Sequence, residues 1–163
     1  MRLVKSGLIT IVTGVVAAFS AVSSASDEYR LSAFADVSGY AQIKSNNIEE
    51  AKEFIVARSG KKMDFLELNN LCVLELLVED FSSAIEICEA ALGKSTSTRG
   101  IGFGAKKKVA ASIHSNLAVG KALNGDLEGA KIELEMALSL NSFDKNAKAN
   151  LEWLASSVLI AGL

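Results

Sequence analysis

The chain of 163 residues has no proline, a single histidine and few aromatic residues, which make up 6% of the sequence. Without proline, a helix can continue without a fixed break, and the abundant alanine and leucine favour helix over strand. Runs in which β-branched or aromatic residues alternate with polar ones, the usual sign of strands, do not occur in the sequence. These absences predict an all-α protein.

The sequence also lacks the residue patterns that carry catalysis, metal binding or nucleic-acid binding. Its one histidine, His114, falls in a helical apolar pattern, and neither an HExxH motif nor a Ser/His/Asp set accompanies it. One histidine and two separated cysteines do not make a zinc site. A formal net charge of −2 leaves no basic surplus for nucleic acid. We therefore expect no enzyme activity, cofactor, metal site or nucleic-acid partner.

What the sequence does contain is a helical pattern that repeats. It is clearest from Asn116 to Asn141, where two apolar stripes at helical spacing stand on either side of Gly125-Asp126. This arrangement predicts two antiparallel helices joined by a tight turn. The same offsets recur around Asp80 and, more faintly, around Asn47. Each copy has a small residue where two helices would touch closely; these residues are Ala51, Ala84 and Ala130.

The two clearest copies match at eight positions. In the later copy these are Leu117, Ala118, Asp126, Leu127, Ala130, Leu134, Ala137 and Leu138. In the earlier copy they are Leu71, Cys72, Asp80, Phe81, Ala84, Cys88, Ala91 and Leu92. This pattern resembles the tetratricopeptide repeat (TPR) family, although the family's opening aromatic and closing proline are missing here. The resemblance implies about three TPR-like antiparallel helix hairpins, stacked in a right-handed superhelix, with repeats at about 31–60, 63–92 and 105–141 and a C-terminal capping helix at about 144–160.

The first 25 residues have the features of a secretory signal peptide. Arg2 and Lys5 precede an uncharged apolar core, Leu8–Phe19, and the small residues Ser23-Ser24-Ala25 suit cleavage. The apolar core is shorter than the roughly 20 residues of a membrane-spanning helix. We therefore expect an exported protein of the bacterial periplasm whose helical domain covers residues 26–163. The alternative is an uncleaved N-terminal segment that anchors the protein in the membrane.

Two further segments have a definite expected structure. Between Ser26 and Arg58 the pattern predicts two helices, Leu31–Lys44 and Ile48–Arg58. The stretch 93–108 contains four glycines and four serine or threonine residues, which predicts a long loop. Its Gly93-Lys94-Ser95 ends like a phosphate-binding loop, but the earlier glycine of that motif is replaced by Cys88 and no strand is expected before it. We interpret this stretch as a solvated connection.

The two cysteines are expected to form a disulfide. Cys72 lies eight residues before Asp80 and Cys88 eight residues after it, so a turn at Asp80 places them level on facing helices. Both fall on the inward-facing stripes, and helix axes 8–10 Å apart allow a disulfide between such positions. In an oxidising compartment the two thiols would couple. The alternative is a pair of free thiols in the core.

The TPR resemblance also implies a binding surface. In that family, an asparagine just before the leucine of each first helix can face a groove and bind a peptide backbone, and the matching residues are Asn70, Asn116 and Asn150. Neighbouring candidates for the same groove are Asn69, Val73, Ser112, Ser115, Val119, Asn146 and Trp153. The family's carboxylate-gripping version has Lys or Arg at the asparagine positions, which argues against recognition of a C-terminal carboxylate here. The alternative is that the asparagines only bridge neighbouring helices.

The function that follows is protein binding. We expect an exported adaptor or scaffold that binds a protein partner, or an extended peptide segment of one, in its concave groove. The alternative is a structural subunit or assembly factor of a cell-envelope complex, docked through the apolar C-terminal stretch Trp153–Leu163. The sequence leaves the oligomeric state open.

Overall fold

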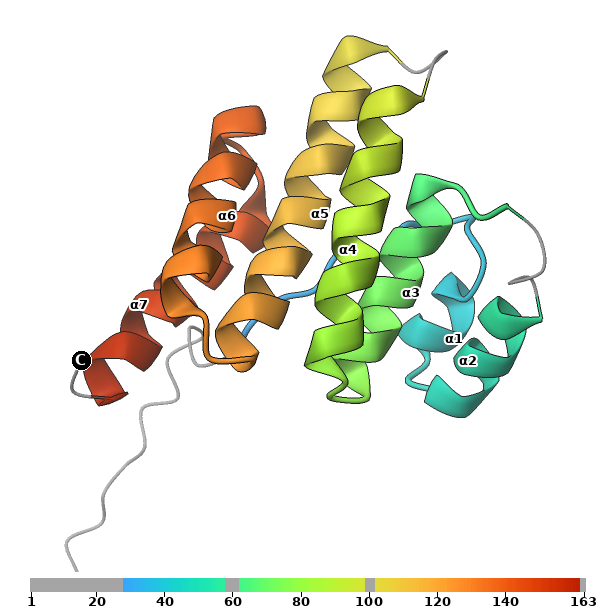
Figure 1. The fold of residues 1–163 in the computed structure, drawn as a ribbon, viewed down its shortest axis with the longest axis horizontal. Helices are drawn as coiled ribbons and strands as arrows, with labels where there is room; N and C mark the ends of the chain where they lie inside the picture. Colours follow the sequence, from blue (N-terminus) through green and yellow to red (C-terminus); the bar gives the residue numbers. More distant parts are fainter. Residues whose placement is uncertain (1–27, 58–61, 99–101, 162–163) are drawn as a thin grey trace, which may run out of the picture.

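The computed structural model describes residues 28–57, 62–98 and 102–161, and this part of the chain contains helices and no strand (Figure 1). The helices are α1 (Tyr40–Lys44), α2 (Ile48–Val56), α3 (Phe65–Leu77), α4 (Phe81–Ser97), α5 (Phe103–Leu123), α6 (Leu127–Leu140) and α7 (Lys145–Ala161). The predicted all-α class is confirmed. Within the described ranges, no helix is long and apolar enough to cross a membrane. The expected signal peptide, residues 1–25, lies outside them.

Helices that follow one another in the chain are also neighbours in space. α3 packs on α4, α4 on α5, and α5 on α6, while α7 contacts both α5 and α6. At the other end, α1 and α2 pack together and α2 contacts α3. Figure 1 shows the resulting row of helices, with the segment before α1 passing behind it. This row places α3, α5 and α7 so that all three can contact that segment.

Three turns between helices have the same backbone conformation, and they connect α1 to α2, α3 to α4 and α5 to α6. In each turn one residue has a positive φ: Asn46 (56°), Glu79 (62°) and Gly125 (91°). The N–H of the next residue donates to the carbonyl five residues earlier, in the pairs Asn47 with Gln42, Asp80 with Glu75 and Asp126 with Lys121. This is the hydrogen bond of a Schellman helix end. The repeated sequence pattern therefore corresponds to a repeated turn.

Aspartates begin the helices that follow. The carboxylates of Asp80 and Asp126 accept a hydrogen bond from the backbone N–H three residues later, at the start of α4 and α6. Asp64 caps α3 in the same way by accepting from the Glu67 backbone N–H, and the Glu67 carboxylate accepts from the Asp64 N–H, which completes a capping box. Such a cap stabilises a helix by about 1 kcal/mol. Together the caps and the turns fix where each helix begins.

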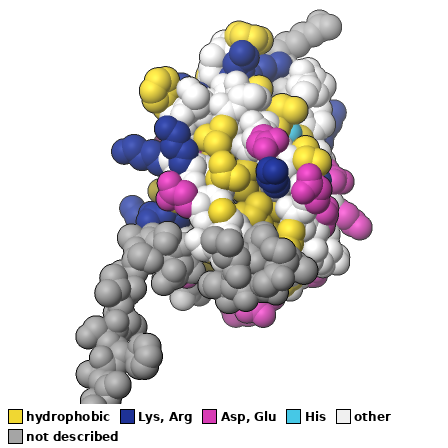
Figure 2. All heavy atoms as spheres, turned by 90° about the vertical axis from the view of Figure 1, so that its left-hand side faces the viewer, with side chains coloured by type: hydrophobic (Ala, Val, Ile, Leu, Met, Phe, Trp, Pro, Cys, Tyr) yellow, Lys and Arg dark blue, Asp and Glu magenta, His cyan; other side chains and the backbone are white. Residues whose placement is uncertain are grey.

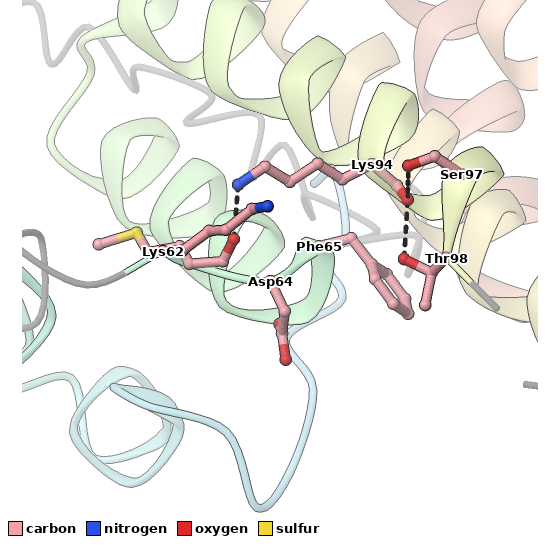
Figure 3. A pocket seen from close by; sticks show the side chains of 7 residues that line it. Lys62, Asp64, Phe65, Lys94, Ser97 and Thr98 are labelled. Carbon is pink, nitrogen blue, oxygen red and sulfur yellow. Dashed lines mark hydrogen bonds between the residues drawn. The ribbon is translucent and has the colours of Figure 1, made fainter. Parts of the chain in front are cut away.

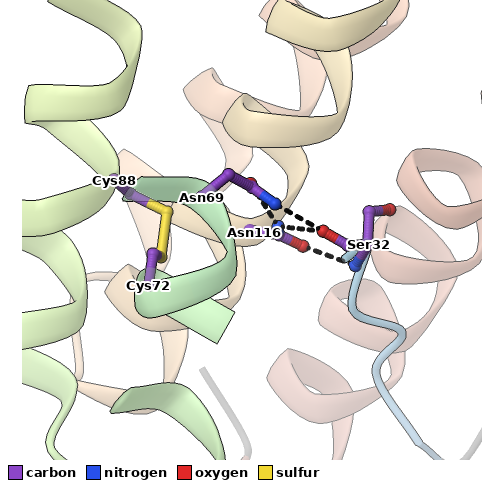
Figure 4. Close-up of a disulfide and its surroundings, with 5 residues drawn as sticks. All are labelled: Ser32, Asn69, Cys72, Cys88 and Asn116. Carbon is purple, nitrogen blue, oxygen red and sulfur yellow. Dashed lines mark hydrogen bonds between the residues drawn. A yellow bond between two sulfur atoms is a disulfide. The ribbon is translucent and has the colours of Figure 1, made fainter. Parts of the chain in front are cut away.

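The core between paired helices includes small residues at the helix contacts and one disulfide. Ala84 and Ala91 of α4, and Ala130 and Ala137 of α6, are fully buried. The predicted disulfide between Cys72 and Cys88 is present and links α3 to α4, with a Cα–Cα distance of 5.4 Å (Figure 4). A disulfide is compatible with an oxidising compartment. Because successive residues of a helix are rotated by about 100°, Asn70 points to the side of α3 opposite Cys72.

The predicted helix Leu31–Lys44 is wrong over most of its length. Residues 28–39 are not helical, and α1 begins only at Tyr40. The backbone groups of Arg30, Ser32 and Phe34 are hydrogen-bonded to side chains of other helices instead of to their own chain neighbours. Two left-handed residues, Asp36 (φ 60°) and Gly39 (φ 82°), then separate this segment from α1. The apolar pattern here reflects contacts with other helices and not a helix of its own.

The predicted long loop at 93–108 is also wrong, because α4 continues to Ser97 and α5 begins at Phe103. Serine and threonine are normally weak helix formers because their hydroxyls compete for backbone groups. Here the hydroxyls of Ser95, Thr96 and Ser97 each donate to the carbonyl three residues earlier, which is compatible with the helix. Packing of α4 on α5 supplies the remaining stabilisation. α4 and α5 therefore extend into the stretch between the expected repeat bounds at 92 and 105.

Candidate functional site

Three predicted asparagines hold an extended segment of the same chain. Each amide side chain bonds both the N–H and the C=O of one residue, and the pairs are Arg30 with Asn150, Ser32 with Asn116 and Phe34 with Asn70. The six donor–acceptor distances lie between 2.6 and 3.1 Å. We call residues 29–34 the resident segment, and the face of α3, α5 and α7 that carries these three asparagines the ladder face.

The match between an asparagine amide and an extended backbone has a geometric cause. In an extended chain the N–H and C=O of one residue point to the same edge, and those of the next residue point to the opposite edge. A primary amide offers one acceptor and one donor side by side. Three amides therefore bind the backbone of residues 30, 32 and 34, and the backbone N–H and C=O groups of residues 31 and 33 point to the opposite edge. This contact reads the backbone and is independent of the side chains of the bound residues.

Two of these asparagines, Asn116 and Asn150, also bridge helices. Nδ2 of Asn116 on α5 donates to Oδ1 of Asn69 on α3 at 2.9 Å, and Nδ2 of Asn150 on α7 donates to the Ser115 hydroxyl on α5 at 2.9 Å. Asn69 in turn donates to the Ser32 carbonyl at 2.8 Å, so Figure 4 shows Asn69 and Asn116 both pointing toward Ser32. Backbone binding, here to the protein's own segment, and helix bridging occur together in this network. The bridges fix the orientation of the Asn116 and Asn150 amides.

Burial shows how completely the network is satisfied. Asn69, Asn70, Asn116 and Asn150 are 0% exposed, and Ser115 is equally buried. Within the described residues, no buried side-chain nitrogen or oxygen lacks a hydrogen-bond partner. A buried amide without partners would cost about 1–3 kcal/mol. The ladder face is therefore complete only while an extended backbone lies on it.

Side chains of the resident segment add contacts beyond the backbone. The ring of Tyr29 meets Trp153 edge-on, with centroids 5.4 Å apart and planes at 69°. Leu31 and Phe34 pack against the core cluster formed by α3, α4 and α5. The Ser32 hydroxyl accepts a hydrogen bond from Asn146 Nδ2 at 2.8 Å. These contacts place Trp153 and Asn146, both predicted from the sequence, beside the segment.

Burial also affects the Tyr29 hydroxyl, whose pKa lies above its ordinary value. Desolvation is the main cause, and the negative charges of Glu28 and Glu79 add to it. The phenol therefore stays neutral at physiological pH, so the contact between Tyr29 and Trp153 does not depend on pH in that range.

The other predicted site residues lie elsewhere. Val73 and Val119 belong to the buried core, with 1% and 0% of their surface exposed. The Ser112 hydroxyl contacts Asp144 Oδ2 at 3.4 Å, and Asp144 caps the start of α7 through the N–H groups of Asn146 and Ala147. Ser112 therefore helps to hold α7 in place. The sequence did not indicate that residues 29–34 bind the ladder face. Leu31 and Phe34 were apolar residues that could have suggested such a contact.

A second polar cluster lies between α5 and α6. Glu133 Oε2 contacts His114 Nδ1 at 2.7 Å, and Lys121 Nζ donates to Glu133 Oε1 at 2.6 Å. Glu133 is largely buried, with only 15% of its side chain exposed. Burial by itself would raise the pKa of Glu133, but hydrogen bonds from His114 and Lys121 outweigh it and lower the pKa. The cluster links two helices and leaves no free group for chemistry.

An open pocket of about 470 Å³ lies between the start of α3 and the end of α4 (Figure 3). Lys94 reaches across it and donates to the Met63 carbonyl at 2.5 Å, while the hydroxyls of Ser97 and Thr98 donate to the Lys94 carbonyl. These polar groups already have partners inside the protein. The described residues contain no group of three or more acidic, histidine or cysteine side chains that could hold a metal ion.

The end of the molecule formed by α6 and α7 exposes apolar side chains among charged ones (Figure 2). Ile132 and Met136 of α6 are about half exposed, and Phe143 before α7 is 84% exposed. In contrast, Leu154 of α7 is buried and Trp153 packs against the core cluster of α5, α6 and α7. The beginning of the stretch Trp153–Leu163 is thus used within the protein itself.

Comparison of the chain with protein-family models, curated proteins and solved structures finds no match. The resemblance to TPR repeats therefore depends on the residues and turns described above.

Proposed function

We propose that this protein is an exported, TPR-like adaptor whose ladder face forms a groove for an extended segment of a partner protein. The observation that carries the proposal is the set of three asparagines that hold alternate backbone residues of the resident segment. Backbone recognition of this kind needs no particular side chain at the bound residues. It suits a protein that binds extended polypeptide segments.

The repeat interpretation is supported by the turns. The pairs α1–α2, α3–α4 and α5–α6 share one turn conformation, and α7 follows without a partner helix within the described residues. Asn70, Asn116 and Asn150 occupy corresponding places on α3, α5 and α7. Stacked helix pairs of a repeat array present such corresponding positions along one continuous surface. A single type of residue repeated along that surface fits an extended ligand.

The disulfide supports the proposed location. Cys72 and Cys88 are both fully buried and bonded to each other, which is compatible with export into an oxidising compartment. The alternative of a structural subunit docked through Trp153–Leu163 gains less support. Trp153 contacts Tyr29 and Leu154 is buried, so neither is free to serve as an anchor for another protein.

The proposal is tested by replacing Asn70, Asn116 and Asn150 together with alanine. We expect the variant to lose the partners that immobilised wild-type protein captures from an envelope extract of the exporting cell, with the disulfide intact in both. The matched control is Asn124→Ala, since Asn124 is an exposed asparagine at the end of α5.

Stability is measured in parallel because the amides also bridge helices. Loss of the bridges and of the backbone contacts should lower the melting temperature by several degrees, at about 1–3 kcal/mol for each buried polar group left without a partner. Capture is therefore compared at a temperature where both proteins are folded by circular dichroism. Retention of the same partners by the folded triple variant would place the binding surface elsewhere.

A further inference from the structure

The ladder face is already filled by the protein's own chain. The three asparagines use their amides to bind the backbone of Arg30, Ser32 and Phe34, and Asn70 also donates to the Ser38 carbonyl at 3.3 Å. A partner segment that uses the same amides cannot bind until the resident segment leaves. The resident segment therefore blocks a partner from the ladder face. It also shows which kind of segment the ladder face binds.

The contacts of the resident segment define a side-chain pattern. An aromatic ring at Tyr29 meets Trp153, and apolar side chains at Leu31 and Phe34 pack on the core cluster. Between them, the Ser32 hydroxyl accepts from Asn146. Arg30, in contrast, is exposed, so its side chain is not selected. The ladder face thus fits the pattern aromatic–any–aliphatic–serine–any–aromatic in an extended conformation.

The surface beneath the segment tolerates its departure. Once the segment leaves, water can reach the asparagine amides and replace the segment's backbone as their hydrogen-bond partner. The main loss is the apolar contact of Tyr29, Leu31 and Phe34.

The connection to α1 also allows movement of the segment. It joins α1 through residues 35–39, where Asp36 has the uncommon φ of 60° and is exposed. This conformation is strained for residues other than glycine. Release of the segment would remove that strain without disturbing the contacts between helices α3 to α7.

We propose that the resident segment is an intramolecular competitor, and that the partner of this protein supplies an extended segment with the same pattern, Tyr-x-Leu-Ser-x-Phe or a close equivalent. This inference rests on the proposed function. A segment tethered in the same chain has an effective concentration of the order of millimolar. A partner binds only weakly to the closed protein and much more tightly once the resident segment is displaced.

The test uses the full mature chain with one backbone change in the resident segment. Ser32→Pro removes the N–H that Asn116 accepts, so it weakens the grip on the segment and leaves the ladder face intact. Ala33→Pro is the matched control, because residue 33 faces away from the ladder. The probe is a labelled synthetic peptide with the sequence of residues 28–38, EYRLSAFADVS. We expect it to bind the Ser32→Pro protein at least tenfold more tightly than the wild type or the Ala33→Pro protein.

Variants of the probe establish how it binds. The peptide that itself carries Ser32→Pro should not bind, and the peptide with Tyr29→Ala and Phe34→Ala should bind at least tenfold more weakly. The native peptide should also raise the melting temperature of the Ser32→Pro protein. If Ser32→Pro prevents folding, the double variant Tyr29→Ala/Leu31→Ala serves as the opened protein, because it removes side-chain contacts and leaves the backbone unchanged.

The outcomes separate the two proposals. Equal binding to the opened and wild-type proteins would overturn the competition, and equal binding of the native and the Tyr29→Ala/Phe34→Ala peptides would overturn the side-chain pattern. Neither result contradicts the proposal that the ladder face is a binding groove. Adding Asn116→Asp to the opened protein tests the groove, since this change removes the donor to the Ser32 carbonyl. Peptide binding unaffected by Asn116→Asp would contradict the proposed function as well.

Discussion

The α3–α4 pair and the α5–α6 pair have the same turn, the same aspartate cap and the same small-residue contacts, but they are held together by different means. In α3–α4 the disulfide Cys72–Cys88 crosses the interface. In α5–α6 the corresponding positions are Ala118 and Leu134, both buried, and a charged cluster around Glu133 links the helices instead. The turn and the close helix contact are thus common to both pairs, whereas the link between the helices differs.

The largest expected effect comes from removing the covalent link. Replacing both cysteines with alanine should lower the free energy of unfolding by about 3 kcal/mol, since the disulfide closes a loop with a sequence separation of 16. For a domain of this size the melting temperature should fall by about 10 °C. Thermal unfolding followed by circular dichroism measures the change.

A second variant sharpens the comparison. Cys72→Ala/Cys88→Leu places the residues of the α5–α6 pair into α3–α4. If the two interfaces are equivalent, leucine fills part of the space left by the sulfur atoms, and this variant should be more stable than Cys72→Ala/Cys88→Ala. A leucine variant less stable than the alanine variant would show that the α3–α4 helices are packed too closely to accommodate the leucine found in the α5–α6 pair.

The comparison also shows which features the sequence could predict. The turns at Asp80 and Asp126, the helices around them and the disulfide follow from local patterns: a capping aspartate, a helical apolar stripe and two cysteines at equal distances from a turn. The asparagines were predicted by their positions relative to those helices. Each of these predictions depends on residues close together in the chain.

The resident segment could not be predicted in this way. Leu31, Phe34 and their neighbours have a spacing that also suits a helix, and only contacts 36 to 120 residues away in the chain decide otherwise. The end of α4 was missed for a related reason. Its serine and threonine residues have low helix propensity, and their inclusion in the helix depends on packing against α5. Tertiary contacts override local preference in both places.

The next largest effect is expected in the α5–α6 pair, at its charged cluster. Glu133→Gln removes the charge that His114 and Lys121 face, and should lower the free energy of unfolding near neutral pH by about 1–2 kcal/mol. The control is Glu135→Gln on the same helix, where the side chain is exposed. Urea unfolding at a series of pH values measures both variants.

The pH dependence follows from the lowered pKa of Glu133. A carboxylate whose pKa is lower in the folded than in the unfolded protein stabilises the fold above its ordinary value of about 4.5, and this stabilisation is lost as the pH falls through the lower folded value. The difference in free energy of unfolding between wild type and Glu133→Gln should therefore be largest above the ordinary pKa of about 4.5 and should decrease as the pH is lowered below it. A difference that stays constant from neutral pH to acid would show that the charge of Glu133 contributes little.

The smallest expected effect is at the turns, where the two pairs have different residues at the position with positive φ. Glu79 and Gly125 occupy the same position with positive φ, of 62° and 91°. A residue with a β-carbon is strained there, whereas glycine is not. Glu79→Gly should therefore raise the free energy of unfolding by up to about 1 kcal/mol, and Gly125→Ala should lower it by a similar amount. The space around Gly125 is open, with nothing within 4 Å of an added β-carbon, so any loss there arises from backbone strain and not from a clash.

Urea unfolding of both single variants and of the double variant measures the effects, which should add because the turns lie in different helix pairs. A gain at Glu79 without a loss at Gly125, or the reverse, would show that the two turns are not energetically equivalent despite their common backbone.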